Sequence, residues 1–270
     1  MKALKQSEWA SLMKKYLIAL LSTLLLMSGC AIQNKDLSNK KTALKAKQYP
    51  PADFIPNDVK IVSVGDSLTQ GVGADDKLGG YIPFLKEDLE KLKSINKVEF
   101  ENHGKKGNRT DQLLKRLKQQ SVMADIMEAD MVIITIGGND VMQVFRENLL
   151  GLKLNKFIAA EDAYQERLDE IIALIRSYNS DAGIVLVGIY NPFIKWFSDI
   201  KEMDQVVDNW NNVSYETVTK YNHTLFVPVA DIFENNEESL LYTDYFHPNT
   251  RGYELIAERI YDYLVAEDYL

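Results

Sequence analysis

The sequence predicts an α/β fold in which one parallel β-sheet of five strands carries helices on both faces. Short apolar runs rich in β-branched residues alternate along the chain with longer amphipathic patterns of helical period, and this alternation is typical of a parallel sheet. Of the 270 residues, 46% are hydrophobic and 26% are charged. That composition is ordinary for a globular protein and suits one sizeable domain.

The five expected strands are short and mostly apolar. Residues 59–65, VKIVSVG, form a β-branched run that predicts a buried strand. Residues 131–136, MVIITI, are apolar throughout, so we place this strand near the centre of the sheet. The remaining expected strands are residues 97–101, 183–189 and 225–229.

The expected helices lie between these strands. Leu85, Leu89 and Leu92 recur on one face of residues 81–93, which is the spacing of an amphipathic helix. Two loops at the carboxyl edge of the sheet, residues 141–160 and 190–210, are rich in aromatic and aliphatic residues, which either line a substrate pocket or only pack the loops. The other expected helices are residues 110–120, 161–178, 203–221 and 250–266, and the loops are residues 71–80, 141–160 and 190–210.

Residues 1–29 have the features of a secretory signal peptide. The apolar run at residues 16–27 follows two lysines and is too short for a comfortable membrane span. It ends in MSGC at residues 27–30, which resembles the bacterial lipobox, with Met27 in place of the usual leucine. In a lipobox the cysteine becomes the lipid-modified first residue of the mature protein, so we expect lipidation at Cys30.

Two alternatives concern this N-terminal segment. The first is an ordinary secretory signal with an incidental cysteine, although Cys30 is the only cysteine in the chain and stands where a lipobox needs it. A single cysteine also excludes an intrachain disulfide. The second is translation from Met13 rather than Met1, because the basic region before the apolar run is unusually long.

Residues 30–56 are polar, rich in lysine and end in prolines, which predicts a flexible tether before a domain at residues 57–270. Residues 1–47 hold 9 of the 31 basic residues but only 2 of the 39 acidic ones, so residues 48–270 carry a net charge of −15. An anionic membrane would attract the stalk and repel the domain, unless the acidity only keeps a secreted domain soluble. The charge argues against nucleic-acid binding. We expect a lipid-anchored protein on the outer face of the cytoplasmic membrane.

Ser67 is the candidate nucleophile. It follows the buried strand at residues 59–65, after Gly65 and Asp66, and so lies at the edge where open α/β sheets bind ligands. The same turn can open a helix, whose free N–H groups favour a developing negative charge. The alternative is that Asp66 and Ser67 are plain turn and helix-cap residues.

His247 is the candidate general base for a serine nucleophile, which needs one within hydrogen-bond reach. Asp244 stands three residues before it, where a turn lets the carboxylate accept the Nδ1 proton and leaves Nε2 free for the serine. The alternative for His247 is a helix-cap or core histidine. His103 and His223 have no such partner in the sequence, and we interpret both as structural or surface residues.

Acyl transfer also needs donors for the oxyanion. Gly107 offers an unhindered backbone N–H, Asn139 offers a side-chain amide after two glycines, and Ser67 offers its own backbone N–H. Each also fits a simple turn, since glycine-rich turns after strands are common. Gly104 lies three residues before Gly107 and is the competing donor.

Taken together and in this order, the blocks resemble the GDSL (SGNH) hydrolase family. They are GDSL at residues 65–68, Gly107, GGND at residues 137–140 and DYFHP at residues 244–248. The resemblance covers about residues 59–266 and is greatest to the lipoprotein branch of Gram-positive bacteria. It implies a three-layer α/β/α, flavodoxin-like fold and an esterase or lipase that uses no metal or organic cofactor. The residues it implies are Ser67, Asp244 and His247 as the catalytic triad, with Ser67, Gly107 and Asn139 as the oxyanion hole.

Two other classes of function compete with an esterase. Asp66 after a strand could be the nucleophile of a phosphotransferase, but such families usually place a second acid at the position that Leu68 occupies here. The other competing class is a catalytically silent, lipid-anchored binding protein, which would be favoured if Ser67 or His247 were replaced. For an esterase, the sequence leaves lipid esters and acetylated glycans open as substrates.

Overall fold

The computed structural model describes the domain and not the N-terminal segment. The described residues are 55–75, 79–148, 151, 153–191, 201–234, 236–267 and 269. The predicted signal peptide, Cys30 and nearly all of the tether therefore lie outside the described residues. Within the described part, the structure contains an all-parallel sheet of five strands in the order β2-β1-β3-β4-β5, which confirms the predicted fold class.

The strands lie close to their predicted positions. They are β1 (Asn57–Gly65), β2 (Ile95–Gly104), β3 (Met131–Thr135), β4 (Gly183–Val187) and β5 (Thr224–Val227). Every residue of β3 and β4 is buried, because helices cover both faces of these central strands. In the register of the sheet, Val62 lies beside Val132, which lies beside Ile184. Since all five strands run in one direction, their carboxyl ends meet at one edge.

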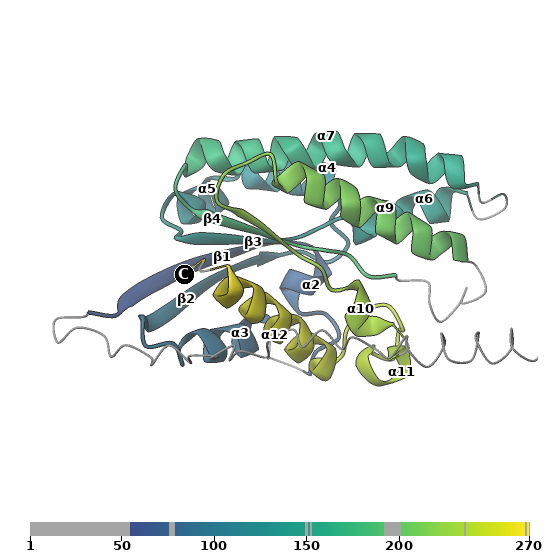
Figure 1. Cartoon of the computed structure of the whole chain (residues 1–270). Helices are drawn as coiled ribbons and strands as arrows, with labels where there is room; N and C mark the ends of the chain where they lie inside the picture. The colour runs from purple at the N-terminus through teal and green to yellow at the C-terminus, as the bar shows by residue number, and fades with distance from the viewer. Residues whose placement is uncertain are drawn as a thin grey trace, which may run out of the picture. The chain divides into compact units, whose positions relative to one another are not determined.

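Helices form one layer on each face of the sheet (Figure 1). One layer consists of α4 (Thr110–Leu117), α5 (Gln120–Met127), α6 (Gly138–Glu147), α7 (Leu154–Tyr178) and α9 (Lys201–Val218). The other consists of α3 (Ile82–Leu89), α10 (Ala230–Phe233), α11 (Glu237–Leu240) and α12 (Thr250–Ala266). The short helix α2 (Ser67–Gln70) follows β1 at the carboxyl edge of the sheet.

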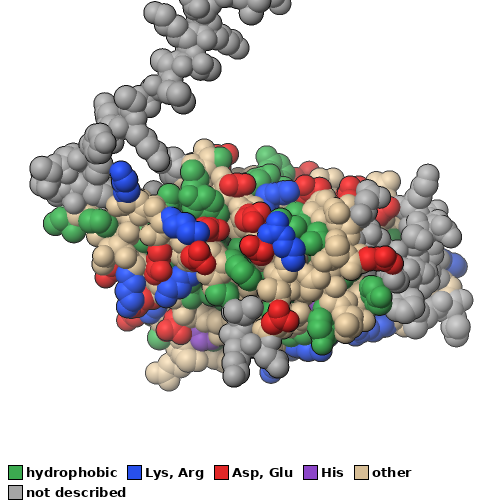
Figure 2. Space-filling view, turned by 90° about the horizontal axis from the view of Figure 1, so that it is seen from below, with side chains coloured by type: hydrophobic (Ala, Val, Ile, Leu, Met, Phe, Trp, Pro, Cys, Tyr) green, Lys and Arg blue, Asp and Glu red, His purple; other side chains and the backbone are tan. Residues whose placement is uncertain are grey.

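The surface of the layer that holds α3 and α12 mixes acidic and basic side chains (Figure 2). Arg251 pairs with Glu254 at 2.6 Å, and Arg259 pairs with Asp231 at 2.7 Å. Exposed pairs of this kind contribute about 0–1 kcal/mol each to stability. Their main effect is that cations on this face are largely neutralised by neighbouring carboxylates.

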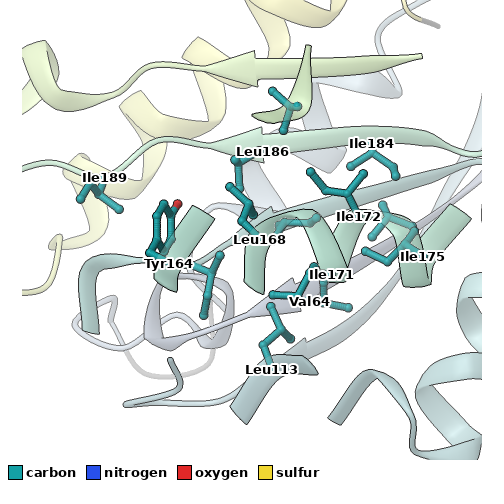
Figure 3. Close-up of a cluster of buried hydrophobic side chains, with 14 of the residues drawn as sticks. Val64, Leu113, Tyr164, Leu168, Ile171, Ile172, Ile175, Ile184, Leu186 and Ile189 are labelled. Carbon is teal, nitrogen blue, oxygen red and sulfur yellow. The ribbon is translucent and has the colours of Figure 1, made fainter. Parts of the chain in front are cut away.

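The sheet separates two apolar cores, because successive side chains of a strand point to opposite faces. Val62 and Val64 of β1 lie in the core on the α7 side, whereas Ile61 lies in the core on the α12 side. Figure 3 shows the core on the α7 side, where Leu168 of α7 lies close to Leu186 of β4. Burial of these aliphatic side chains supplies the driving force that holds the helices on the sheet.

The structure differs from the sequence prediction at residues 141–160, which were expected to form a loop. Residues up to Glu147 belong to α6, and α7 begins at Leu154 rather than at residue 161. Val144 of α6 and Phe157 of α7 are buried in the core on the α7 side. For these two side chains, packing is therefore the correct alternative and pocket lining is wrong. The glycines at the start of α6 have the composition of a turn, which hid the helix that follows.

Candidate active site

The turn after β1 is shaped by a close approach between two strands. Gly65 has a φ of 147°, and a Cβ atom there would lie 2.1 Å from the carbonyl oxygen of Thr135 at the end of β3. Only glycine fits this position. Asp66 then caps α2 by accepting a hydrogen bond from the Leu68 N–H at 3.0 Å. The first helical residue is Ser67, whose hydroxyl-bearing side chain is thereby held at the carboxyl edge of the sheet.

Asp66 has structural partners within this turn and on the neighbouring strand. Its Oδ1 accepts hydrogen bonds from Leu68 N and from Thr135 Oγ1, both at 3.0 Å, and the residue is only 3% exposed. Burial raises the pKa of Asp66 to about 7, although the two hydrogen bonds act to lower it. Among the described residues, no three His, Cys, Asp or Glu side chains are grouped as metal ligands.

His247 and Asp244 form the pair that their spacing predicts. His247 Nδ1 lies 2.6 Å from Asp244 Oδ2, while Asp244 Oδ1 accepts the backbone N–H groups of Phe246 and His247, each at 3.0 Å. Burial acts to raise the pKa of Asp244, but these hydrogen bonds outweigh it and lower the pKa below its ordinary value. The ionised carboxylate favours the tautomer with the proton on Nδ1, which leaves Nε2 as the acceptor.

Gly107 and Asn139 lie together at the same edge. Asn139 Nδ2 donates to the carbonyl oxygen of Asn108 at 3.0 Å, which ties the start of α6 to the loop after β2. The Gly104 N–H is occupied by Asn102 Oδ1 at 2.8 Å, and a Cβ atom on Gly104 would lie 2.1 Å from Gln70 N. Gly104 is therefore required for close packing against α2. Of the two candidate glycines, Gly107 borders the cavity that Asn139 and His247 also line.

Two cavities with common walls bring the sequence-predicted residues together. A small, mainly apolar cavity of about 30 Å³ is lined by Asp66, Ser67, Leu68, Thr135, Ile136, Gly138, Asn139, Gly188, Ile189, Tyr190 and Phe246. A wider cavity of about 580 Å³ is lined by Lys106, Gly107, Arg109, Asn139, Gln143, Arg146, Glu147, Asp244, Phe246 and His247. Asn139 and Phe246 belong to both. Ser67 therefore lines the small cavity, whereas His247 and Asp244 line the wide one.

The predicted loop walls contribute less than expected. Of the stretch at residues 190–210, Tyr190 lines the small cavity, whereas residues 192–200 lie outside the described residues. Gly73, in the stretch at residues 71–80, packs beneath the His247 turn, since a Cβ atom there would lie 2.5 Å from Pro248 O. This part of the loop therefore supports the His247 turn and does not line either cavity.

The remaining histidines lie outside both cavities, as expected. His103 Nε2 lies 2.8 Å from Asp125 Oδ2 of α5. His223 Nδ1 lies 3.0 Å from the carbonyl oxygen of Asp181, and its ring packs on Tyr269 with centroids 4.7 Å apart. Both histidines are therefore bound to structural partners.

Sequence reasoning missed Arg116, which holds three parts of the edge together. Its Nη1 donates to Gly65 O at 3.3 Å and to Asn108 Oδ1 at 3.0 Å, and its Nη2 donates to His103 O at 2.6 Å. Within the described ranges it makes no ion pair, so its fork of donors is used entirely on neutral oxygens. Burial lowers the pKa of Arg116. Nothing local in the sequence marks this arginine, because all three acceptors come from other elements or loops.

A second buried network joins α4, α6 and α7. Asp140 accepts the Thr110 N–H at 3.0 Å and the Thr110 hydroxyl at 2.6 Å, and Arg167 Nε donates to Thr110 Oγ1 at 2.7 Å. Burial raises the pKa of Asp140, against the effect of the Thr110 hydrogen bonds and of the Arg167 charge. Asp140 therefore positions the first turns of α4 and α6, which carry the Gly107 and Asn139 segments.

The structure is that of an α/β protein with a five-stranded parallel sheet, and comparison with known proteins identifies its family. Residues 63–255 match the model of the GDSL-like Lipase/Acylhydrolase family. The chain is also 36% identical over 248 residues to the Uncharacterized protein YpmR of Bacillus subtilis (strain 168), covering 91% of this chain and 94% of that protein. The chain therefore belongs to the GDSL-like lipase/acylhydrolase family.

Two further relatives carry descriptive names. The Spore germination lipase LipC of Bacillus licheniformis is 25% identical over 211 residues, which cover 75% of this chain and 94% of that protein. The crystal structure of the lipase Lip_vut3 from a goat rumen metagenome superimposes with a TM-score of 0.69 at 25% identity, covering 76% of this chain and 98% of that one. These likenesses extend over the domain that carries the two cavities.

Substitution of Arg116 tests whether activity depends on the hydrogen bonds that this residue makes at the carboxyl edge of the sheet. Arg116→Met should lower kcat for ester hydrolysis on the order of 10- to 100-fold with a smaller change in KM, because small misplacements of reacting groups are costly. Arg116→Lys keeps the charge without the planar fork and should recover only part of the rate. Steady-state kinetics on a soluble ester, with thermal unfolding measured in parallel, provide the readout.

Arg176 is the matched control for this test. It is also a half-buried guanidinium, and its Nη2 donates to the carbonyl oxygens of Asn222 at 2.8 Å and His223 at 2.7 Å. Those acceptors precede β5 and so lie at the opposite edge of the sheet. Arg176→Met should lower the unfolding temperature but preserve kcat. Equal kcat losses in the Arg116 and Arg176 variants would show that Arg116 contributes only stability.

Proposed function

We propose that this protein is a serine esterase with Ser67 as nucleophile, His247 as general base and Asp244 as the group that orients the imidazole. The observation that carries the proposal is the 2.6 Å contact between His247 Nδ1 and Asp244 Oδ2. The pair borders a cavity that shares Asn139 and Phe246 with the cavity beside Ser67. A serine needs such a base because its hydroxyl is a weak nucleophile at neutral pH.

In the proposed mechanism, Ser67 Oγ attacks the ester carbonyl carbon while its proton passes to His247 Nε2. The negative charge that develops on the carbonyl oxygen is stabilised by the N–H groups of Ser67 and Gly107 and by the Asn139 amide. Collapse of this intermediate breaks the ester bond, and the alcohol leaves with the proton from His247. Water, deprotonated by the same imidazole, then releases the acid and restores Ser67.

The small cavity supports short acyl groups, which favours the O-acetyl esterase among the candidate activities. A water molecule needs roughly 10–15 Å³ of cavity space by the same measure, so about 30 Å³ holds little more than a methyl or ethyl group. The wall is braced, because the Tyr190 hydroxyl donates to Phe246 O at 2.5 Å and the Tyr190 ring lies 4.2 Å from that of Phe233. A long acyl chain would have to displace these side chains.

We also propose that residues 1–29 are removed as a signal peptide and that Cys30 carries the lipid that anchors the domain through a tether at residues 30–56. The support is the sequence alone: a short apolar run that ends at the only cysteine. None of the helices in the described part of the chain is both long and apolar enough to cross a membrane. The domain would then act on the outer face of the cytoplasmic membrane.

Kinetic measurements on variants test the roles that we propose for the general base and the oxyanion donors. A single oxyanion donor is typically worth about 10²–10³ in turnover, whereas a triad base is worth on the order of 10⁶ in well-studied serine proteases. His247→Ala should therefore lose more activity than Asn139→Ala, which should keep its KM. A fluorophosphonate should label Ser67, as mapped by peptide mass spectrometry. Labelling of another residue, or a His247→Ala variant with most of the wild-type rate, contradicts the assignment.

Acyl-chain preference tests the small cavity. With p-nitrophenyl esters, kcat/KM should be highest for acetate or propionate and fall for butyrate and octanoate. Ile189→Ala removes part of the cavity wall and should move the optimum to a longer chain, by analogy with other enlarged apolar pockets. Ile133→Ala, which empties space in the core on the α12 side, is the control and should keep the acetate preference. Highest activity on octanoate in the wild type would exclude the short-chain assignment.

The anchoring proposal predicts the behaviour of Cys30→Ser in the bacterial cell. Without the thiol no lipid can be attached, so the variant should be released to the medium or accumulate unprocessed. A lipid modification with several acyl chains gives stable attachment, whereas one chain is marginal. Fractionation with immunoblotting provides the measurement. A Cys30→Ser protein that stays in the membrane at the processed size would overturn the proposal.

A further inference from the structure

The wide cavity beside His247 carries an unusual charge for this protein. Residues 48–270 have a net charge of −15, yet three basic side chains, those of Lys106, Arg109 and Arg146, line this one cavity. Two carboxylates, those of Asp244 and Glu147, line it as well. Which of these charges a ligand would meet depends on the partners that each already has.

The two carboxylates of the wide cavity accept hydrogen bonds, which position them without cancelling their charge. Asp244 is bound to His247, and Glu147 Oε1 accepts a hydrogen bond from Gln143 Nε2 at 2.7 Å. Arg109 is likewise paired, since its Nε lies 3.1 Å from Asp111 Oδ1.

Lys106 and Arg146 differ from Arg109 in the partners of their side chains. Neither side chain forms an ion pair or hydrogen bond within the described ranges of the chain, and both are exposed. The cations on the α12 side of the sheet, by contrast, are matched by neighbouring carboxylates (Figure 2). The wide cavity therefore offers two positive charges that lack partners in the described part of the chain, in a domain where acidic residues outnumber basic ones.

The position of these two cations relates them to the ester. Asn139, Gln143 and Arg146 recur on one face of α6, at the spacing of successive helical turns. At 1.5 Å per residue, Arg146 lies about 10 Å along the helix from Asn139. Lys106 directly precedes Gly107, and both residues line the same cavity. Both cations line the wide cavity, and neither lines the small cavity that we assign to the acyl group.

We propose that the wide cavity binds the alcohol portion of the ester and selects alcohols that carry a negative charge, with Lys106 and Arg146 as the anion-binding residues. This inference rests on the proposed esterase function and adds the substrate class to it. A carboxylate or a phosphate on the alcohol would satisfy the two cations. Attraction of the anion to these two cations also raises the rate of encounter, most of all at low ionic strength, where screening is weakest.

The test compares two acetate esters of similar shape, 4-acetoxybenzoate and neutral 4-acetoxybenzamide, with 4-acetoxyphenyl phosphate as the phosphate arm. The measured quantity is the ratio of kcat/KM for each anionic ester to that for the neutral ester. The ratio in the Lys106→Gln/Arg146→Gln variant should be about fivefold lower than in the wild type at low salt, as expected when exposed charge contacts are lost. The wild-type ratio should also fall as sodium chloride rises from 0.01 to 0.5 M.

The control variant removes the same charge elsewhere. Lys118 and Lys220 are exposed, follow α4 and α9, and lie at the opposite edge of the sheet. Lys118→Gln/Lys220→Gln should keep the wild-type ratio. An equal ratio in the wild type and the Lys106/Arg146 variant, or an equal loss in the control, overturns the anion-binding inference. Absence of hydrolysis of all three esters would instead contradict the proposed function, so the two failures are distinguishable.

Discussion

The close contact between β1 and β3 at the carboxyl edge of the sheet is the constraint on which the candidate site depends. Asp66 N donates to Thr135 O at 3.0 Å, and Thr135 Oγ1 lies 2.8 Å from Thr69 Oγ1. With Gly65 pressed against Thr135, the chain must turn at once into α2. The turn therefore places Ser67 in one position relative to the sheet, and every other part of the site must be arranged around that position.

Two hydrogen-bond networks hold the other segments at the carboxyl edge of the sheet, one around the Arg116 guanidinium and one around the buried Asp140 carboxylate. Arg116 joins the ends of β1 and β2 to the Asn108 loop, and Asp140 joins the first turns of α4 and α6 through Thr110. Burying such groups is costly unless their hydrogen bonds are satisfied, so each network favours one arrangement of the loops. Precise placement of this kind is what an acyl-transfer site requires, because the donors must be in position before charge develops.

The fold was largely predictable because its signals are local. Short apolar runs indicated all five strands within a few residues, and amphipathic patterns at helical spacing indicated α3, α4, α7, α9 and α12. The helices α5, α6, α10 and α11 were not expected. The helix α6 begins at Gly138-Asn139, whose composition favours a turn, and its helical conformation depends on burial of Val141 and Val144 in the core on the α7 side. Tertiary packing here overrides local propensity.

By itself the sequence indicated the candidate site residues that follow the first three strands, and it predicted the Asp244–His247 pair, because three residues in a turn keep the two side chains within reach. The tertiary structure decided which glycine borders the cavity, since Gly104 is consumed by packing against α2. It also decided that Arg116 binds segments at the carboxyl edge of the sheet and that the candidate site has a small apolar cavity and a wide one lined by several charged side chains. Those features join residues that are far apart in the chain, and only the packing of helices on the sheet brings such residues together.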